Sequence, residues 1–278
     1  MIKTILRRTI LLTTICMLGA CSSEMDFKVD NVHDNIIVMG HGGMGFFHRY
    51  PMNSFESIMN CIRLGADGTE IDVQLSRDNV LYAFHDGLLD DATNMTGAIR
   101  DKESETLNEC FYGKQTNSEF RLARLDKTME KLSAYPGLKF SFDCKLSPGM
   151  DNEEQYYSDF IDAIGKLIKE YHLQGHVYIE SSNPDFLLML RRKMPAAYRF
   201  YYASDFEDAI NYLKNDRVQG ITISGEKISA EQITQLHDMN IMVALFGAKS
   251  PSGNKDFVKR NADIIQSDYV KDLIDLIR

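Results

Sequence analysis

LGADGTEIDVQLSRDNVLYAFHD, residues 64–86, is the stretch that most constrains the fold of this chain. Polar and apolar residues alternate along both of its arms, which is the pattern of half-buried β-strands. The arms are separated by Arg77, Asp78 and Asn79, and an Asp-Asn pair between alternating runs is typical of a hairpin turn. The stretch therefore predicts two antiparallel strands joined by a tight turn.

This hairpin brings two carboxylates and a histidine together. Glu70 and Asp72 are two positions apart, so a strand places both on one face and turns the apolar residues between and after them to the other. If the turn is centred between residues 78 and 79, Asp72 lies roughly opposite His85. Such a face is either a solvated surface or a divalent-metal site beside an acid–base group, and the rest of the chain favours the second interpretation.

The composition is that of an ordinary globular protein with an acidic balance. The chain has 278 residues, of which 44% are hydrophobic and 26% charged, and its net charge is −9. This length is sufficient for one large domain or two small ones with a sizeable core, and no internal boundary is visible. The negative charge argues against nucleic acid as a partner, because tracking a polyphosphate backbone requires a basic surface.

The N-terminal segment has the pattern of a targeting signal. Basic residues precede an apolar run at residues 9–18, which is too short to span a bilayer. The sequence LGAC at residues 18–21 resembles the bacterial lipobox, in which the signal is removed before a cysteine that receives lipid. We therefore expect a lipoprotein signal peptide at residues 1–20, lipid on Cys21 and a polar tether over residues 21–33. Acyl chains would hold the protein outside the cytoplasm, on the periplasmic face or the surface of a bacterial membrane.

Strand-like and helix-like segments alternate over residues 34–278. Nine strands are predicted, at residues 35–40, 69–75, 80–84, 139–145, 177–181, 198–202, 220–224, 241–246 and 263–266. Amphipathic helices are predicted at residues 54–64, 125–134, 152–171, 184–193, 206–215, 230–239, 255–260 and 270–277. Alternation of this kind predicts right-handed crossovers and a parallel sheet.

The strand count indicates a closed barrel. The strand at residues 80–84 follows its predecessor with no room for a crossover helix, so it must run antiparallel. Eight βα strands remain, which is the number that closes a TIM (β/α)8 barrel. The predicted fold is thus an α/β TIM barrel with a β-hairpin and a small insertion after the second strand. The insertion covers about residues 86–124 and is expected to form a lobe over the mouth of the barrel.

Chemically active side chains gather where the predicted barrel strands end, as they do in TIM barrels generally. The first strand ends at His41, and the segment KFSFDCK at residues 139–145 places Asp143 and Lys145 on one face. An aspartate and a lysine that face the inside of a barrel need partners, because an unpaired buried charge is costly. A metal ion beside Asp143 and a phosphate beside Lys145 would satisfy both.

These motifs occur in the order found in the glycerophosphodiester phosphodiesterase family, which the chain resembles over residues 35–278. The matching segments are GHGG at residues 40–43, PMNS at 51–54, the hairpin stretch at 64–86, TNMTG at 93–97, FDCKL at 142–146, SSNP at 181–184 and ADIIQSD at 262–268. The resemblance implies a TIM barrel that hydrolyses glycerophosphodiesters of lipid metabolism to an alcohol and glycerol 3-phosphate with the help of a metal ion.

The resemblance also implies a role for each of six residues: His41 and His85 as the acid–base pair, Glu70, Asp72 and Asp143 as metal ligands, and Lys145 as a phosphate contact. Three carboxylates without a soft ligand favour Mg²⁺ or Ca²⁺ over zinc. One histidine would take the proton of the nucleophile while the other protonates the leaving alkoxide. The nucleophile is either water or the glycerol hydroxyl of the substrate, the latter through a cyclic phosphate.

The chain departs from the family pattern in four places. Asp143 stands where the family usually has a glutamate, and residues 243–246 lack the tryptophan that this strand often carries. The other two departures follow the first strand. Gly42 follows His41 where the family has an arginine, and Met52 stands where it has a glutamate. One positive and one negative charge are lost together, which is consistent with contact between the two positions. The missing arginine leaves two alternatives open: a related phosphodiesterase that cleaves phospholipids or sphingolipids, and a surface lipoprotein that binds ligands on a catalytically degenerate barrel.

Overall fold

The computed structural model of this protein describes residues 36–46, 49–114, 119–147 and 152–278. The predicted signal peptide, the tether and the lipidation site at Cys21 lie outside these ranges. Among the helices within them, none has the length and apolar character needed to cross a bilayer.

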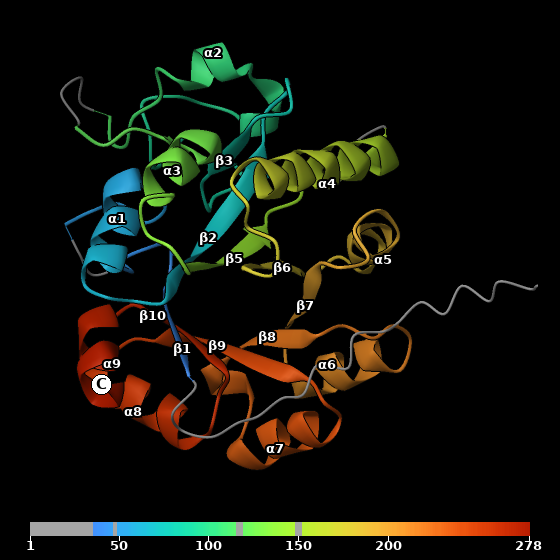
Figure 1. Ribbon diagram of the computed structural model, residues 1–278. Helices are drawn as coiled ribbons and strands as arrows, with labels where there is room; N and C mark the ends of the chain where they lie inside the picture. Colours follow the sequence, from blue (N-terminus) through green and yellow to red (C-terminus); the bar gives the residue numbers. More distant parts are fainter. Residues whose placement is uncertain (1–35, 47–48, 115–118, 148–151) are drawn as a thin grey trace, which may run out of the picture.

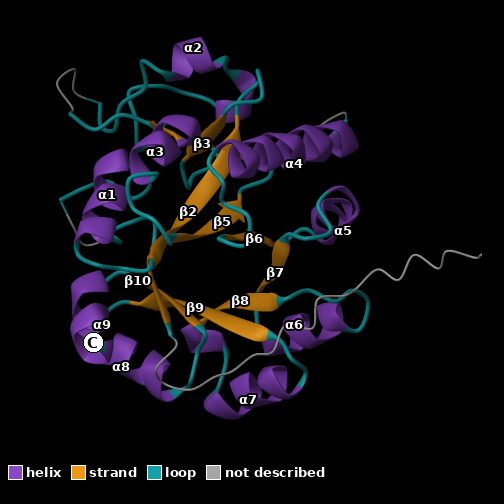
Figure 2. Cartoon of the chain, viewed as in Figure 1, coloured by secondary structure: helices purple, strands orange, loops and turns teal. Residues whose placement is uncertain are grey.

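Eight parallel strands close into a barrel (Figures 1 and 2). β1 pairs with β10 on one side and with β2 on the other, and the remaining strands follow in chain order between them. The barrel strands are β1 (Ile37–Gly40), β2 (Gly68–Leu75), β5 (Lys139–Cys144), β6 (Val177–Ser181), β7 (Tyr198–Ala203), β8 (Gly220–Ser224), β9 (Met242–Ala248) and β10 (Ile264–Ser267). The predicted TIM barrel is confirmed.

A layer of helices surrounds the barrel (Figure 2). The helices that follow successive barrel strands are α1 (Phe55–Arg63), α3 (Leu125–Leu132), α4 (Glu153–Glu170), α5 (Pro184–Lys193), α6 (Phe206–Leu213), α7 (Ala230–Asp238), α8 (Pro251–Lys259) and α9 (Val270–Ile277). Most of them begin after a serine, asparagine or aspartate whose side chain accepts a backbone hydrogen bond from the first turn. These caps fix where each helix starts, because the first N–H groups of a helix otherwise have no partner.

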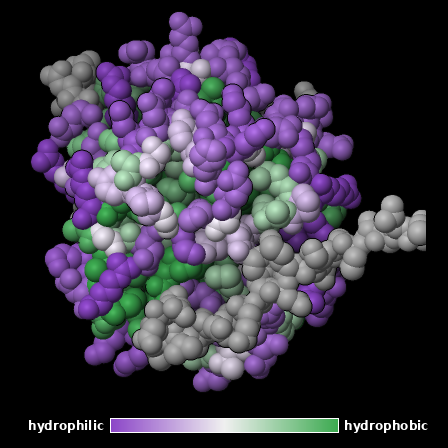
Figure 3. All heavy atoms as spheres, viewed as in Figure 1, coloured by the Kyte–Doolittle hydropathy of each residue, from purple (hydrophilic) through white to green (hydrophobic). Residues whose placement is uncertain are grey.

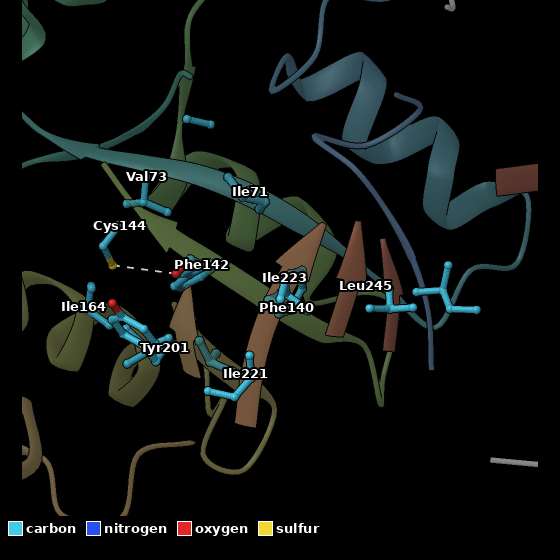
Figure 4. Packing of buried hydrophobic residues seen from close by; sticks show 14 of the residues in the cluster. Ile71, Val73, Phe140, Phe142, Cys144, Ile164, Tyr201, Ile221, Ile223 and Leu245 are labelled. Carbon is cyan, nitrogen blue, oxygen red and sulfur yellow. Dashed lines mark hydrogen bonds between the residues drawn. The ribbon is translucent and has the colours of Figure 1, made fainter. Parts of the chain in front are cut away.

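The main core lies between the barrel and its helices. Ile71 and Val73 of β2 pack there with Phe140 and Phe142 of β5, and Figure 4 shows them in the same cluster as Ile164 of α4. Burying one such side chain contributes roughly 1.5–3 kcal/mol. Because strand side chains alternate, the polar residues between these four point into the barrel.

The hairpin after β2 has a register one residue away from the predicted one. β3 (Leu81–Ala83) runs antiparallel to β2, and the Phe84 N–H donates to the Asp72 carbonyl at 2.9 Å. Asp72 is therefore opposite Phe84, and the prediction that it lies opposite His85 was wrong. His85 instead comes after the last pair of the ladder and carries its side chain toward the barrel mouth.

The turn itself explains the shift. The Ser76 N–H donates to the Val80 carbonyl, and Ser76 Oγ accepts from the Val80 N–H, so these two residues close the turn. Three residues lie between them, and the last one, Asn79, has a φ of 63°. A three-residue loop that ends in the left-handed conformation is a common hairpin form. Its odd length places the centre of the turn on residue 78 instead of between 78 and 79.

Residues 87–114 and 119–124 form a lobe beside the hairpin, at the end of the barrel where β2 finishes (Figure 1). It contains η2 (Ile99–Asp101), α2 (Ser104–Leu107) and β4 (Ala123–Arg124), and β4 extends the sheet by pairing with β3. Its core is separate from that of the barrel and consists of Tyr82, Phe84, Leu89, Ile99, Leu107, Cys110, Tyr112 and Leu122. Hydrophilic residues cover the upper part of the view in Figure 3, where α2 lies.

Candidate active site

Three carboxylates converge inside the barrel near the C-terminal ends of β2 and β5. The strand register pairs Asp72 with Asp143 and Glu70 with Ser141, so all three acids share the inner face of neighbouring strands. One oxygen of each acid lies within 4.8 Å of the others, and all three residues are buried. The structure thus brings the three predicted metal ligands together.

Lys145 is the counterion of this carboxylate cluster. Its Nζ lies 3.0 Å from Asp72 Oδ1 and 2.5 Å from Asp143 Oδ2. Burial alone would lower the pKa of Lys145, but the attraction of the two aspartates outweighs burial and raises it. Burial and the charges of Asp72 and Asp143 raise the pKa of Glu70 well above its usual value. Burial raises the pKa of Asp143 too, against the attraction of Lys145. One lysine therefore does not balance three acids.

The carboxylate cluster fits a divalent cation. Glu70, Asp72 and Asp143 offer hard oxygen ligands, and no cysteine or histidine of the described residues belongs to the group. Hard oxygen ligands of this kind suit Mg²⁺ or Ca²⁺. A bound cation would also relieve the repulsion that raises the pKa of Glu70. These three side chains are the ones that would hold it.

The loop between β1 and α1 holds two of the three carboxylates in place. Asn53 Nδ2 donates to Asp72 Oδ2 at 2.7 Å, and Asn53 Oδ1 accepts from the Asp72 N–H at 3.0 Å. The Gly42 N–H donates to Glu70 Oε2 at 2.8 Å. Asn53 has a φ of 64°, a left-handed conformation that asparagine adopts more readily than most residues. Asn53 belongs to the PMNS segment, whose pattern alone predicts no role for it.

Two of the four departures from the family pattern are neighbours in space. A Cβ atom at position 42 would lie 2.8 Å from Met52 Cε and 3.0 Å from Met52 Cβ. Gly42 also has a φ of 53°, so a side chain there would be strained as well as crowded. This contact supports the interpretation that the two substitutions compensate each other. Arg49 lies in the same loop, but its side chain is exposed and pairs with Glu119 at 2.7 Å, so it does not take the place of the missing arginine.

His41 is held by a buried aspartate. Its Nδ1 lies 2.9 Å from Oδ1 of Asp268, whose side chain is 6% exposed. Burial by itself would lower the pKa of His41, but the hydrogen bond and charge of Asp268, together with the charge of Asp72, outweigh burial and raise it. Because a carboxylate only accepts, Nδ1 carries the hydrogen and Nε2 is left for a substrate. Asp268 belongs to the ADIIQSD segment and lies 227 residues from His41 in the chain, and no sequence pattern predicts this pairing.

His85 lies at the mouth of the site. Its Nδ1 is 2.8 Å from Asp86 Oδ1, and its side chain is 59% exposed. It lines a cavity of about 740 Å³ together with Asp143 and Lys145, and its charge acts on Asp143. Both predicted histidines are therefore near the carboxylate cluster, and each has a carboxylate at Nδ1.

Comparison with known proteins gives one consistent result. The sequence profile of the glycerophosphoryl diester phosphodiesterase family matches residues 44–272. A glycerophosphodiester phosphodiesterase from Bacillus altitudinis is 24% identical over 233 residues, which are 81% of this chain and 92% of the relative. The profile covers the carboxylate cluster, Lys145 and His85, and begins just after His41.

Solved structures show the same fold. A phosphodiesterase from Oleispira antarctica, solved with the product sn-glycerol 3-phosphate, has a TM-score of 0.73 and 22% identity over 86% of this chain and 96% of its own. A glycerophosphodiester phosphodiesterase from Thermotoga maritima has a TM-score of 0.68 and 20% identity over 87% of this chain and 98% of its own.

We predict that the carboxylate cluster binds Mg²⁺ or Ca²⁺ in solution. Isothermal titration calorimetry of the metal-free protein should detect binding of one of these ions, and Asp72→Asn or Asp143→Asn should weaken it by about tenfold or more, because each removes a ligand charge. Asp162→Asn removes an exposed carboxylate of α4 and should leave the affinity unchanged. Equal losses in all three variants would contradict the prediction.

We predict that Asp268 keeps His41 protonated to a higher pH than an ordinary histidine. In an NMR titration of the metal-free protein, the pKa of His41 should exceed about 6.5, and Asp268→Asn should lower it. The raised pKa means that the pair contributes stability below the pKa of an unfolded histidine, and that this stability is lost as the pH rises through the pKa of folded His41. An unchanged pKa in Asp268→Asn, with the amide spectrum preserved, would rule out this coupling.

Proposed function

This chain belongs to the glycerophosphoryl diester phosphodiesterase family, and on that premise we propose that it hydrolyses glycerophosphodiesters to an alcohol and glycerol 3-phosphate. The observation that carries the proposal is the buried cluster of Glu70, Asp72 and Asp143. Burying three acids beside a single lysine lowers the stability of the fold, because the acids repel one another away from water. A functional requirement therefore accounts for them best. Relatives of this chain are named for the same activity.

Lys145 and the carboxylate cluster are the charged groups of the proposed phosphate site. The cluster would hold Mg²⁺ or Ca²⁺, which supplies positive charge against the anionic oxygen of the phosphodiester. Lys145 is within 3.0 Å of both aspartates, so it can turn its one remaining N–H donor to a phosphate above them. Tyr202 lines the same cavity, and its ring lies 5.9 Å from Lys145 Nζ, which limits the directions open to the ammonium group.

His41 and His85 carry the proton transfers in this proposal. Each is fixed at Nδ1 by a carboxylate, Asp268 in one case and Asp86 in the other, so each presents Nε2. One imidazole accepts the proton of the attacking hydroxyl, and the other donates a proton to the leaving alkoxide. The fixed tautomers remove the need to reorient either ring at the moment of reaction.

We predict that the lipid-free protein releases glycerol 3-phosphate from glycerophosphodiesters, and that EDTA abolishes this activity. His41→Ala and His85→Ala should each lower kcat by roughly 10²–10⁴-fold, because each removes a proton-transfer group. His176→Ala is the matched control, since this histidine contacts the Leu138 carbonyl at the entrance to β5 and β6, away from the site. These rates are measured for each variant with a substrate panel of glycerophosphocholine and glycerophosphoinositol.

The same panel, extended with intact phospholipids and sphingolipids, decides between the proposal and its alternatives. Preference for intact phospholipids or sphingolipids would indicate a related lipid phosphodiesterase, which the Gly42 and Met52 substitutions leave open. Metal binding without turnover of any diester would indicate a binding protein. Activity that survives both EDTA and the loss of either histidine would contradict the mechanism.

We also propose that the protein is a lipoprotein held at a bacterial membrane through Cys21, a proposal that rests on the LGAC segment at residues 18–21. In bacteria that express the full chain, Cys21→Ser should abolish incorporation of an alkyne fatty acid and move the protein from the membrane to the soluble fraction. Cys16→Ser changes another cysteine of the same segment and should leave both unchanged. Labelling that persists in Cys21→Ser would contradict this assignment.

A further inference from the structure

Arg100 reaches the active-site cavity from the lobe. It lies in η2 and lines the same 740 Å³ cavity as His85 and Lys145. Its neighbour Ile99 is almost completely buried in the lobe core, which fixes the backbone of η2 against the hairpin. The Arg100 side chain is 27% exposed, so most of it is withdrawn from solvent. Nothing in the sequence motifs had assigned this residue a role.

Arg100 and Lys145 are the permanently charged cations among the described residues that line this cavity, and the charge of Arg100 is the less neutralised of the two. Lys145 is shared by two buried aspartates, and His85 is paired with Asp86. Within the part of the chain that the structure describes, the ion pair of Arg100 is with Asp101 at 3.7 Å, and Asp101 is 65% exposed. Such an exposed contact contributes little. Among the described residues that line the cavity, Asp143 is the single acid, and it is already engaged by Lys145.

The wall across the cavity adds further hydrogen-bond donors. Ser181, Ser182 and Asn183 line it at the start of α5, where the helix end contributes positive partial charge. Tyr157 lines it too, and its hydroxyl accepts from Asn183 Nδ2 at 2.9 Å, which holds the asparagine side chain at this wall. A ligand rich in oxygen acceptors matches this wall, whereas a quaternary ammonium would meet the charge of Arg100 and find no aspartate free to pair with it.

Building on the proposed function, we propose that Arg100 and this wall form a subsite that selects the head group of the substrate, accepting polyhydroxyl groups and rejecting quaternary ammonium groups. The volume supports a head group at this place. A cavity of about 740 Å³ is within the range that encloses a drug-sized ligand and is far larger than a three-carbon glycerol requires. Arg100 is then a specificity-determining residue, placed by the lobe and not by the barrel.

Kinetics with two substrates test this subsite. Arg100→Gln should lower kcat/KM for glycerophosphoinositol by about tenfold, because a charged donor is removed, and should raise kcat/KM for glycerophosphocholine, because the charge that repels its ammonium group is removed. Arg100→Lys keeps the charge without the planar fork and should lose less. Arg121→Gln is the matched control, since this arginine lies in the same lobe and does not line the cavity.

Three results would overturn the subsite. If Arg100→Gln lowers kcat/KM equally for both substrates, Arg100 contacts the phosphate or the glycerol and not the head group. If Arg121→Gln lowers kcat/KM as much as Arg100→Gln does, the effect is a general one on the lobe. If the wild-type protein cleaves neither diester, the proposed function fails, and calorimetric binding of the same two compounds then decides the subsite separately. The subsite is supported if the wild-type protein binds glycerophosphoinositol more tightly than glycerophosphocholine and Arg100→Gln removes this difference. Equal binding of both compounds to the wild-type protein overturns it.

Discussion

Repulsion among Glu70, Asp72 and Asp143 is the constraint on which the rest of this structure depends. Their oxygens lie within 4.8 Å of one another in the buried interior of a barrel, where little water screens the charges. Lys145 offsets part of this repulsion, and the raised pKa of Glu70 reports what remains. The barrel strands tolerate the cluster because their outer faces carry the core, with Ile71, Val73, Phe140 and Phe142 packed against the helices (Figure 4).

The surroundings of the carboxylate cluster show how precise placement is achieved with few residues. Asn53 makes two hydrogen bonds to Asp72, and the backbone of Gly42 makes one to Glu70, so a single loop after β1 orients acids on β2. The contact between positions 42 and 52 is also consistent with the joint replacement of an arginine and a glutamate of the family pattern by glycine and methionine.

The lobe contributes residues to the site in addition to those of the barrel. It has its own apolar core, and it is joined to the barrel by the hairpin and by a hydrogen bond from the Tyr112 hydroxyl to the Met52 carbonyl. This arrangement separates two tasks. In the proposed function the barrel supplies the carboxylate cluster and Lys145 for the phosphodiester, whereas the lobe supplies Arg100, which lines the same cavity. Variation in the lobe can therefore change the ligand without disturbing the barrel.

The sequence by itself determined what depends on local pattern. Period-two alternation predicted the inner faces of β2 and β5, and amphipathic spacing with caps predicted helices such as α5, whose bounds match the predicted residues 184–193. Tertiary structure decided the hairpin register, because one left-handed residue, Asn79, sets whether a turn has an odd or an even length. It also decided the partners Asn53, Asp268 and Arg100, since hydrogen bonds and cavities between residues far apart in the chain form only once closure of the barrel brings their elements together.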